Sequence, residues 1–165
     1  ARLGKTIIYV THDQVEAMAM SDRVAIMKDG VIIQEGKPLD IYKNPKEKFV
    51  ADFIGTTNFI ECDVIGSSGS STDIRLESGF MFAIPEATEI RGRCTLALRP
   101  EDIELSAEGT DGFEAEVEVG IFLGNVIDYR IKVGNSKLRV QSTVATMFRP
   151  GDKVRAKVGR VVLFN

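Results

Sequence analysis

The spacing of hydrophobic positions changes near residue 55 of this chain. Before that point apolar residues recur at helical spacing, and Phe49, Val50, Phe53 and Ile54 form one apolar stripe. After residue 58 apolar and polar residues alternate, which is typical of strands with one buried face. The segment between, 55–58 (GTTN), has the composition of a linker. The pattern therefore predicts two domains, over residues 1–57 and 58–165.

The first domain opens with the segment 6–18, TIIYVTHDQVEAM. Its first five residues, 6–10, are an unbroken β-branched and aromatic run, which predicts a strand buried on both faces, as in a parallel sheet. Asp13 is a favourable N-cap for a following helix, and Glu16 has the spacing of a capping box. His12 lies between this strand and this helix. Ligands of open α/β sheets bind beyond the carboxyl ends of the strands, so His12 is the candidate site residue, and a polar loop residue is the alternative interpretation.

The rest of the first domain reads as a hairpin followed by two helices. Strands are predicted over 23–27 and 31–34, and Asp29-Gly30 between them suits a type I′ turn. Pro38 favours the first turn of a short helix, which Asn44-Pro45 ends. A second helix is predicted over 46–54, with Gly55 as its C′ residue.

The second domain reads as ten short strands separated by turn residues, including a hairpin loop at 66–71 (GSSGSS) and a turn at 108–112. Many short strands at this spacing predict a small barrel or sandwich. The predicted strands cover 59–65, 73–76, 80–84, 94–98, 103–105, 113–122, 126–133, 137–141, 153–158 and 161–164.

Composition places the chain among soluble globular proteins of one or two domains. It has 165 residues, 44% hydrophobic and 27% charged, with a net charge of −3. That charge is unlike the basic footprint of nucleic-acid-binding proteins. No apolar run approaches the ~20 residues that span a bilayer, and no signal peptide precedes the first strand. Because the sequence opens at Ala1 without an initiator methionine, we expect the C-terminal part of a longer protein.

The cysteines and the glycine-lysine pairs offer no site of their own. Cys62 and Cys94 are far apart in the sequence and lack metal-ligand spacing, so they are interpreted as buried free thiols and no metal site is predicted. Gly4-Lys5-Thr6 has the ending of a phosphate-binding loop. However, it opens a strand, whereas the phosphate-binding loop must open a helix, so we reject it.

Several sequence motifs of the first domain resemble those of a known family. YVTHDQVEAM resembles the switch-histidine segment of ATP-binding-cassette (ABC) ATPases. The DG hairpin, the GxP helix start and the FVADFIG helix follow in the same order as in importer ATPases of the maltose, polyamine and ferric-iron type, and this resemblance covers residues 3–60. LALRPEDIEL, VGIFLGNVIDYRI and PGDKVRAKV resemble the transport-associated OB-like (TOBE) domain of the same ATPases.

The resemblance implies a fold, a function and a role for His12. The fold would be α+β: the C-terminal remnant of a P-loop ABC nucleotide-binding domain over 1–57 and an all-β OB-like barrel over 58–165. His12 matches the histidine that contacts the γ-phosphate, while ATP and Mg would be cofactors of the parent protein only. The phosphate loop, the LSGGQ-like string and an apolar run ending in Asp-Glu are missing here, so this chain alone is expected to be inactive.

The resemblance also implies partners and a location. An importer ATPase subunit works with transmembrane permease subunits and a second copy of itself, so a homodimer is expected, with the barrel serving regulation and subunit contact. The location would be cytoplasmic, peripheral on the inner face of the cell membrane, and no nucleic acid is expected as a partner. The solute class could be sugar, polyamine or iron. The segment FIGTTNFIECDV resembles the polyamine- and iron-type relatives somewhat more than the maltose-type ones, but the sequence does not fix the solute.

The alternative is a stand-alone OB-type barrel that binds a ligand or nucleic acid. Four cations, Arg130, Lys132, Lys137 and Arg139, would form a basic strip on adjacent strands. A solvated sheet face explains these residues equally well.

Overall fold

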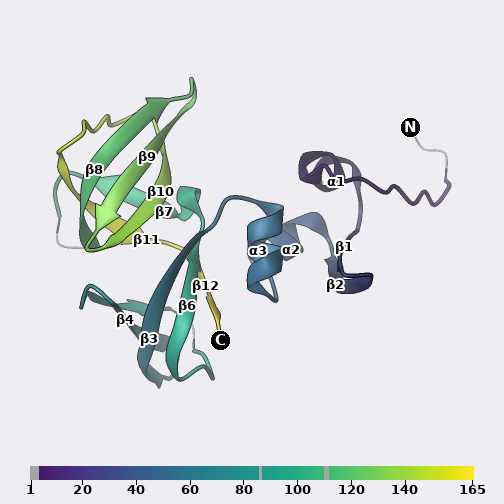
Figure 1. Cartoon of the computed structure of the whole chain (residues 1–165), viewed down its shortest axis with the longest axis horizontal. Coiled ribbons are helices and arrows are strands. Elements are labelled where there is room, and N and C mark those ends of the chain that lie inside the picture. The colour runs from purple at the N-terminus through teal and green to yellow at the C-terminus, as the bar shows by residue number, and fades with distance from the viewer. Residues whose placement is uncertain (1–3, 86, 110–111) are drawn as a thin grey trace. The chain divides into compact units, whose positions relative to one another are not determined.

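The computed structural model describes residues 4–85, 87–109 and 112–165. The chain divides into two compact units, Ala1–Gly55 and Thr56–Asn165 (Figure 1). Leu3 and the centre of the predicted turn at 108–112 lie outside the described residues. The described α-helices all belong to the first unit, and strands make up most of the rest. The structure is therefore predominantly β, as predicted for the second domain, and the first unit combines helices with one hairpin. Across the described ranges, no helix has the length and apolar character needed to cross a membrane.

The first unit combines one hairpin with three short helices around a small core. The Asp29-Gly30 turn has positive φ at both residues, 52° and 81°, as the predicted type I′ hairpin requires. Its core consists of four buried residues: Ile26, Ile41, Val50 and Ile54. The elements are α1 (Gln14–Met20), β1 (Val24–Lys28), β2 (Val31–Gly36), α2 (Pro38–Lys43) and α3 (Lys48–Ile54).

A buried carboxamide fixes the connection between α2 and α3. Gln34 is only 7% exposed. Its Nε2 donates to the carbonyl oxygen of Asn44 at 3.0 Å, and its Oε1 accepts from the backbone N–H of Lys46 at 2.8 Å. A buried polar side chain must find such partners. Gln34 therefore holds the loop after α2, where Asn44-Pro45 ends that helix.

Two predictions for the first unit are wrong. Residues 6–10 form no strand, because a strand needs a hydrogen-bonded neighbour and the run has none in this structure. Gly55 was expected as a left-handed C′ residue, but its φ of 174° is extended. The chain therefore leaves α3 directly in an extended conformation.

The second unit consists of two five-stranded antiparallel sheets, and all ten strands predicted for it are present. One sheet has the order β10-β9-β8-β11-β7, and the other has the order β12-β6-β3-β4-β5. The first comprises β7 (Ile103–Ser106), β8 (Phe113–Phe122), β9 (Val126–Val133), β10 (Ser136–Thr143) and β11 (Lys153–Val158). The second comprises β3 (Asn58–Ser68), β4 (Ser71–Leu76), β5 (Met81–Ile84), β6 (Gly92–Leu98) and β12 (Val161–Phe164).

Both sheets contribute to a single hydrophobic core. Leu96 and Ile74 from one sheet and Ile131 and Tyr129 from the other are each completely buried within it. The phenol oxygen of Tyr129 accepts a hydrogen bond from the backbone N–H of Phe148 at 3.0 Å, so its one polar atom is satisfied. The alternating positions found in the sequence are the ones that face this core.

The serine- and glycine-rich segment 66–71 is shorter as a loop than predicted. β3 continues through Ser68 and β4 begins at Ser71, so the turn is reduced to Gly69 and Ser70. Gly69 has a positive φ of 59°, which suits a tight hairpin turn. Ser67, Ser68 and Ser71 therefore belong to the paired part of β3 and β4 and not to the turn.

Candidate functional site

His12 lies exposed in a bend between the segment 4–11, which has no regular secondary structure, and α1. The helix begins immediately after Asp13, whose carboxylate accepts hydrogen bonds from the backbone N–H groups of Val15 at 2.8 Å and Glu16 at 3.1 Å. The predicted N-cap is confirmed. It fixes the position of His12 relative to the first turn of the helix.

The predicted capping box is replaced by a different arrangement. The backbone N–H of Asp13 donates to the hydroxyl of Thr11 at 2.9 Å. Glu16 instead accepts from the hydroxyl of Tyr9 at 3.0 Å and from that of Thr11 at 3.2 Å. These contacts join Tyr9 and Thr11, which precede His12, to Asp13 and Glu16, which follow it. The backbone around His12 is thus organised locally, even though the preceding run has no strand partner.

An exposed imidazole in such a bend can donate or accept a hydrogen bond near neutral pH. A donor contributes to catalysis when it is aimed at the charge that develops in a transition state. His12 is exposed, so its imidazole is accessible to a ligand. Phosphoryl transfer also needs a phosphate cradle and a metal ion, and His12 was the only residue of this chain predicted for that site.

The predicted basic strip is interleaved with carboxylates. Arg139 lies opposite Arg130 across the β9–β10 ladder. Nε of Arg139 donates to Asp128 Oδ1 at 2.7 Å, and Nζ of Lys137 lies 2.9 Å from Glu118 Oε2. An open hollow of about 420 Å³ beside the strip is lined by Glu118 as well as by Arg130, Lys137 and Arg139. The strip therefore offers much less net positive charge than its sequence suggests.

The central strand β8 extends this alternation of charge. Glu116 pairs with Lys153 of β11, and Arg155 of β11 lies 3.0 Å from Glu114. The hydrogen bond from Lys153, reinforced by the charge of Lys153, holds the pKa of Glu116 below its ordinary value. A face on which rows of acids and bases alternate is typical of a solvated sheet surface.

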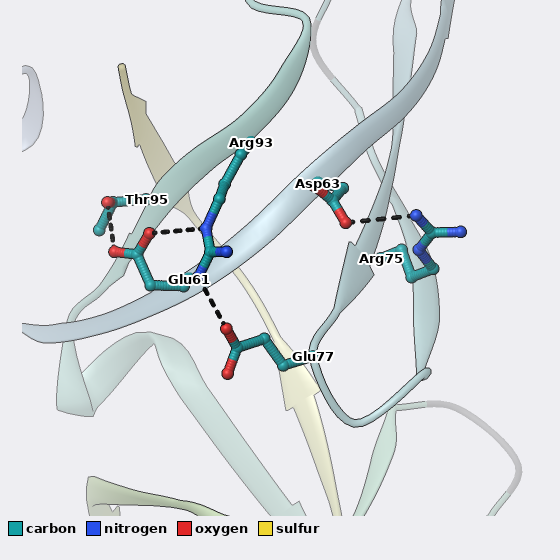
Figure 2. Close-up of polar contacts among 6 residues, drawn as sticks. All are labelled: Glu61, Asp63, Arg75, Glu77, Arg93 and Thr95. Carbon is teal, nitrogen blue, oxygen red and sulfur yellow. Dashed lines mark hydrogen bonds and ion pairs between the residues drawn. The ribbon is translucent and has the colours of Figure 1, made fainter.

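The outer face of the other sheet carries a similar set of ion pairs. Figure 2 shows Glu61 of β3 between two residues of β6, accepting a hydrogen bond from Thr95 at 2.7 Å and lying 3.7 Å from the guanidinium of Arg93. Arg93 also pairs with Glu77 at 2.9 Å, and Asp63 pairs with Arg75 at 3.2 Å. These pairs are largely exposed, so each contributes at most about 1 kcal/mol.

A buried polar network that sequence reasoning missed holds the start of the second unit. Arg99 is 8% exposed, and its Nη1 donates to the carbonyl oxygen of Thr56 at 3.1 Å. The carboxamide of Asn58 bonds twice to the backbone of Arg139: Nδ2 donates to its carbonyl oxygen, and Oδ1 accepts from its N–H, both at 2.8 Å. Asn58 thereby joins β3 to β10, the edge strand of the other sheet. The one signal in the sequence for this network was that Arg99 lies in the LALRP motif.

The chain is similar to known proteins over most of its length. The model of the TOBE domain family matches residues 96–164, which run from within β6 to β12. The spermidine/putrescine import ATP-binding protein PotA of Ruegeria pomeroyi is 42% identical over 92% of this chain and 43% of its own length. The Fe(3+) ions import ATP-binding protein FbpC of Rhizobium etli is 42% identical over 79% of this chain and 37% of its own length.

Over most of its length the chain is similar to the C-terminal part of ABC importer ATP-binding subunits. A further relative, the spermidine/putrescine import ATP-binding protein PotA 1 of Pseudomonas aeruginosa, is 38% identical over 92% of this chain. The chain spans less than half the length of these relatives and matches their C-terminal part, including the TOBE domain. The resemblance carried by the histidine segment and by the LALRPEDIEL string is confirmed.

A solved structure supports the fold of the β-rich part. The cytoplasmic molybdate-binding protein ModG, described with molybdate bound, superposes with a TM-score of 0.57 over 65% of this chain and 94% of its own. The identity is 14%, so this likeness concerns the fold alone. The predicted OB-like architecture is confirmed at that level.

Proposed function

We propose that this chain is the C-terminal portion of the ATP-hydrolysing subunit of an ABC importer, which powers the uptake of a solute. The observation that carries the proposal is the 42% identity to an import ATP-binding protein over 92% of the chain. Residues 1–57 would be the end of the nucleotide-binding α/β domain, and residues 58–165 would be the OB-like regulatory domain. The relatives are importers of spermidine and putrescine or of Fe(3+) ions, so a polyamine or iron is the favoured cargo class, and a sugar is the alternative.

In this proposal His12 is the switch histidine, which contacts the γ-phosphate of ATP in the parent protein. Its exposure just before a capped helix supports that role, because the imidazole is free to meet a nucleotide held by other residues. A donor at this place would stabilise the charge that develops on the transferred phosphoryl group. ATP and Mg would bind in the parent protein, through residues that lie outside this chain.

The proposed partners follow from the same assignment. The subunit would work with transmembrane permease subunits and with a second copy of itself, in the cytoplasm at the inner face of the membrane. The OB-like unit would serve regulation and subunit contact. Its outer faces carry mixed charges, a surface suited to polar contacts that form and break.

The test is the substitution His12→Ala in the full-length parent protein. We expect ATP turnover to fall by about 10² or more, the usual scale for losing one transition-state donor, while nucleotide binding is largely kept. Steady-state ATPase assays and nucleotide titrations measure the two quantities separately.

Lys5→Ala is the matched control, since Lys5 is an exposed residue near the start of the same segment. It should leave turnover within about twofold of the wild type, because it removes no group that meets the phosphate. Near-normal turnover of the His12→Ala protein would refute the switch role. The isolated 165-residue chain should show no turnover above its own His12→Ala variant.

The alternative, a stand-alone barrel that binds nucleic acid, finds less support. Such binding depends on a continuous basic groove, and here Asp128 and Glu118 pair with two of the four cations. We therefore keep the importer assignment as the proposed function.

A further inference from the structure

The two cysteines, 32 residues apart in the sequence, are neighbours in the structure. Cys62 of β3 and Cys94 of β6 are paired directly across the antiparallel ladder, and their sulfur atoms lie 3.4 Å apart. Each side chain is free and only 3% exposed, and both belong to the core of the second unit. The expectation of buried free thiols is confirmed, but their pairing was not foreseen.

The backbone at this pair already has the spacing of a disulfide. Directly opposite residues of an antiparallel pair have Cα atoms about 4.5 to 5.5 Å apart, within the range of about 4.4 to 6.8 Å that disulfides span. The sulfur atoms would approach from 3.4 Å to the ~2.05 Å of an S–S bond. A small rotation of the two side chains supplies that movement without shifting either strand.

We propose that Cys62 and Cys94 form an oxidation site that closes to one intramolecular disulfide between β3 and β6, at a rate set by opening of the sheet. This inference rests on the second unit alone and is independent of the importer function. It assigns a covalent modification to two residues that the proposed function does not use.

The oxidation balances with hydrogen peroxide as the oxidant. One cysteine reacts as its thiolate: its sulfur attacks a peroxide oxygen, the O–O bond breaks, and a sulfenic acid and hydroxide result; the hydroxide takes up the proton that the thiol released and becomes water. The second thiolate then attacks the sulfenic sulfur, so that an S–S bond forms, the S–O bond breaks and a second water leaves. In total two thiols lose two electrons and two protons, and one peroxide becomes two waters.

Burial explains why opening should limit the rate. The thiolate is the reactive form, and burial, followed by the hydrogen bond with Cys94, raises the pKa of Cys62 to about 12. Both strands also have a neighbour on each side in the sheet order β12-β6-β3-β4-β5. Peroxide and water therefore reach the thiols only when this sheet separates locally, and separation also returns the pKa of Cys62 toward its ordinary value.

The disulfide should fit the native fold. It would link two residues that the folded protein already holds opposite one another, so it restricts mainly the unfolded chain. We therefore expect the oxidised protein to fold and to melt at a higher temperature than the reduced protein.

The experiment treats the dilute 165-residue chain with hydrogen peroxide in three arms: native buffer, urea below the unfolding transition, and urea above it. Unreacted thiols are alkylated at intervals, and the products are digested with trypsin. Cys94 directly follows Arg93, and Arg75 separates it from Cys62, so the two cysteines fall in different peptides. A disulfide then appears as one linked pair of peptides in the mass spectrum.

We expect the linked pair to be the main product in every arm, with a rate at least about tenfold higher in sub-transition urea than in buffer, as opening-limited reactions show. Cys94→Ala, which keeps one thiol, should give no linked pair. Equal rates of disulfide formation in native buffer and in unfolding urea would contradict the proposal that opening of the sheet limits the rate. Mostly sulfinic acid, or disulfides between chains, would overturn the pairing. A lower melting temperature of the oxidised wild-type chain would overturn the fit to the native fold.

Discussion

The segment 6–10 and strand β9 are both rich in residues that favour β structure, yet of the two only β9 is a strand. Ile8 and Val10 in the first are 89% and 90% exposed, whereas Ile131 and Val133 in the second are 0% and 5% exposed. β9 has β8 and β10 as neighbours, and the segment 6–10 has no pairing partner in the structure. The comparison teaches that β propensity describes how well a run fits a sheet, while the partner decides whether a strand forms.

Matched isoleucine substitutions should show the largest difference between the two regions. Ile131→Ala removes completely buried core atoms, so we expect a loss of about 2–5 kcal/mol in the free energy of unfolding of the second unit. Ile8→Ala should change the free energy of unfolding of the first unit by less than about 0.5 kcal/mol, because its side chain already lies in water. Urea unfolding followed by circular dichroism measures both. Equal effects of the two substitutions would contradict the description of 6–10 as unpaired.

Substitutions of Asn58 test how much its two hydrogen bonds to the edge strand β10 contribute to stability. Asn58→Ala leaves the buried N–H and C=O of Arg139 without the carboxamide, which should cost about 1–3 kcal/mol of unfolding free energy. Asn58→Asp keeps an acceptor for the N–H but places a buried carboxylate oxygen against the carbonyl oxygen of Arg139, so it should cost at least as much as alanine at neutral pH. Denaturant melts of the three proteins give the ranking. A harmless alanine substitution would mean that the edge of β10 needs no such cap.

A smaller effect is expected from the buried thiol at high pH. The pKa of Cys62 is raised to about 12 by burial, so the folded state holds the proton more tightly than the unfolded state. The stabilisation is complete below the ordinary thiol pKa of about 8.5 and is lost as the pH rises toward the folded value. Unfolding free energies from about pH 8 to 11 should therefore fall more steeply for the wild type than for Cys62→Ala. Parallel slopes for the two proteins would show that Cys62 does not contribute.

Most of the second unit could be predicted from its sequence, because one apolar face per strand and a turn signal after each strand are local properties. The sequence predicts the bounds of β8, β9 and β11 to the residue. The pairing of Cys62 with Cys94 and the bonding of Asn58 to Arg139 were not predictable. Both depend on which strands meet and in which register, and these are long-range properties that a single sequence does not display.

The candidate site was predictable to a lesser degree. His12 was found through its place after a strand-like run and through the resemblance of its segment to the switch-histidine segment, and Asp13 was correctly predicted as the N-cap. The role of Glu16 was misassigned, because Tyr9 and Thr11 compete for its carboxylate through contacts that a capping pattern ignores. The contacts that His12 would make with a nucleotide could not be predicted, because they depend on the proposed parent protein.

The most direct test of the account is hydrogen exchange at the backbone amides of residues 6–10, in this chain and in the full-length parent protein. We expect rapid exchange in this chain, where the segment is exposed and unpaired. In the parent the segment should pair inside the nucleotide-binding sheet and exchange at least about 100-fold more slowly, since paired amides exchange only through costly opening. Equally rapid exchange in both proteins would contradict the assignment of this segment to the nucleotide-binding domain of an importer ATPase.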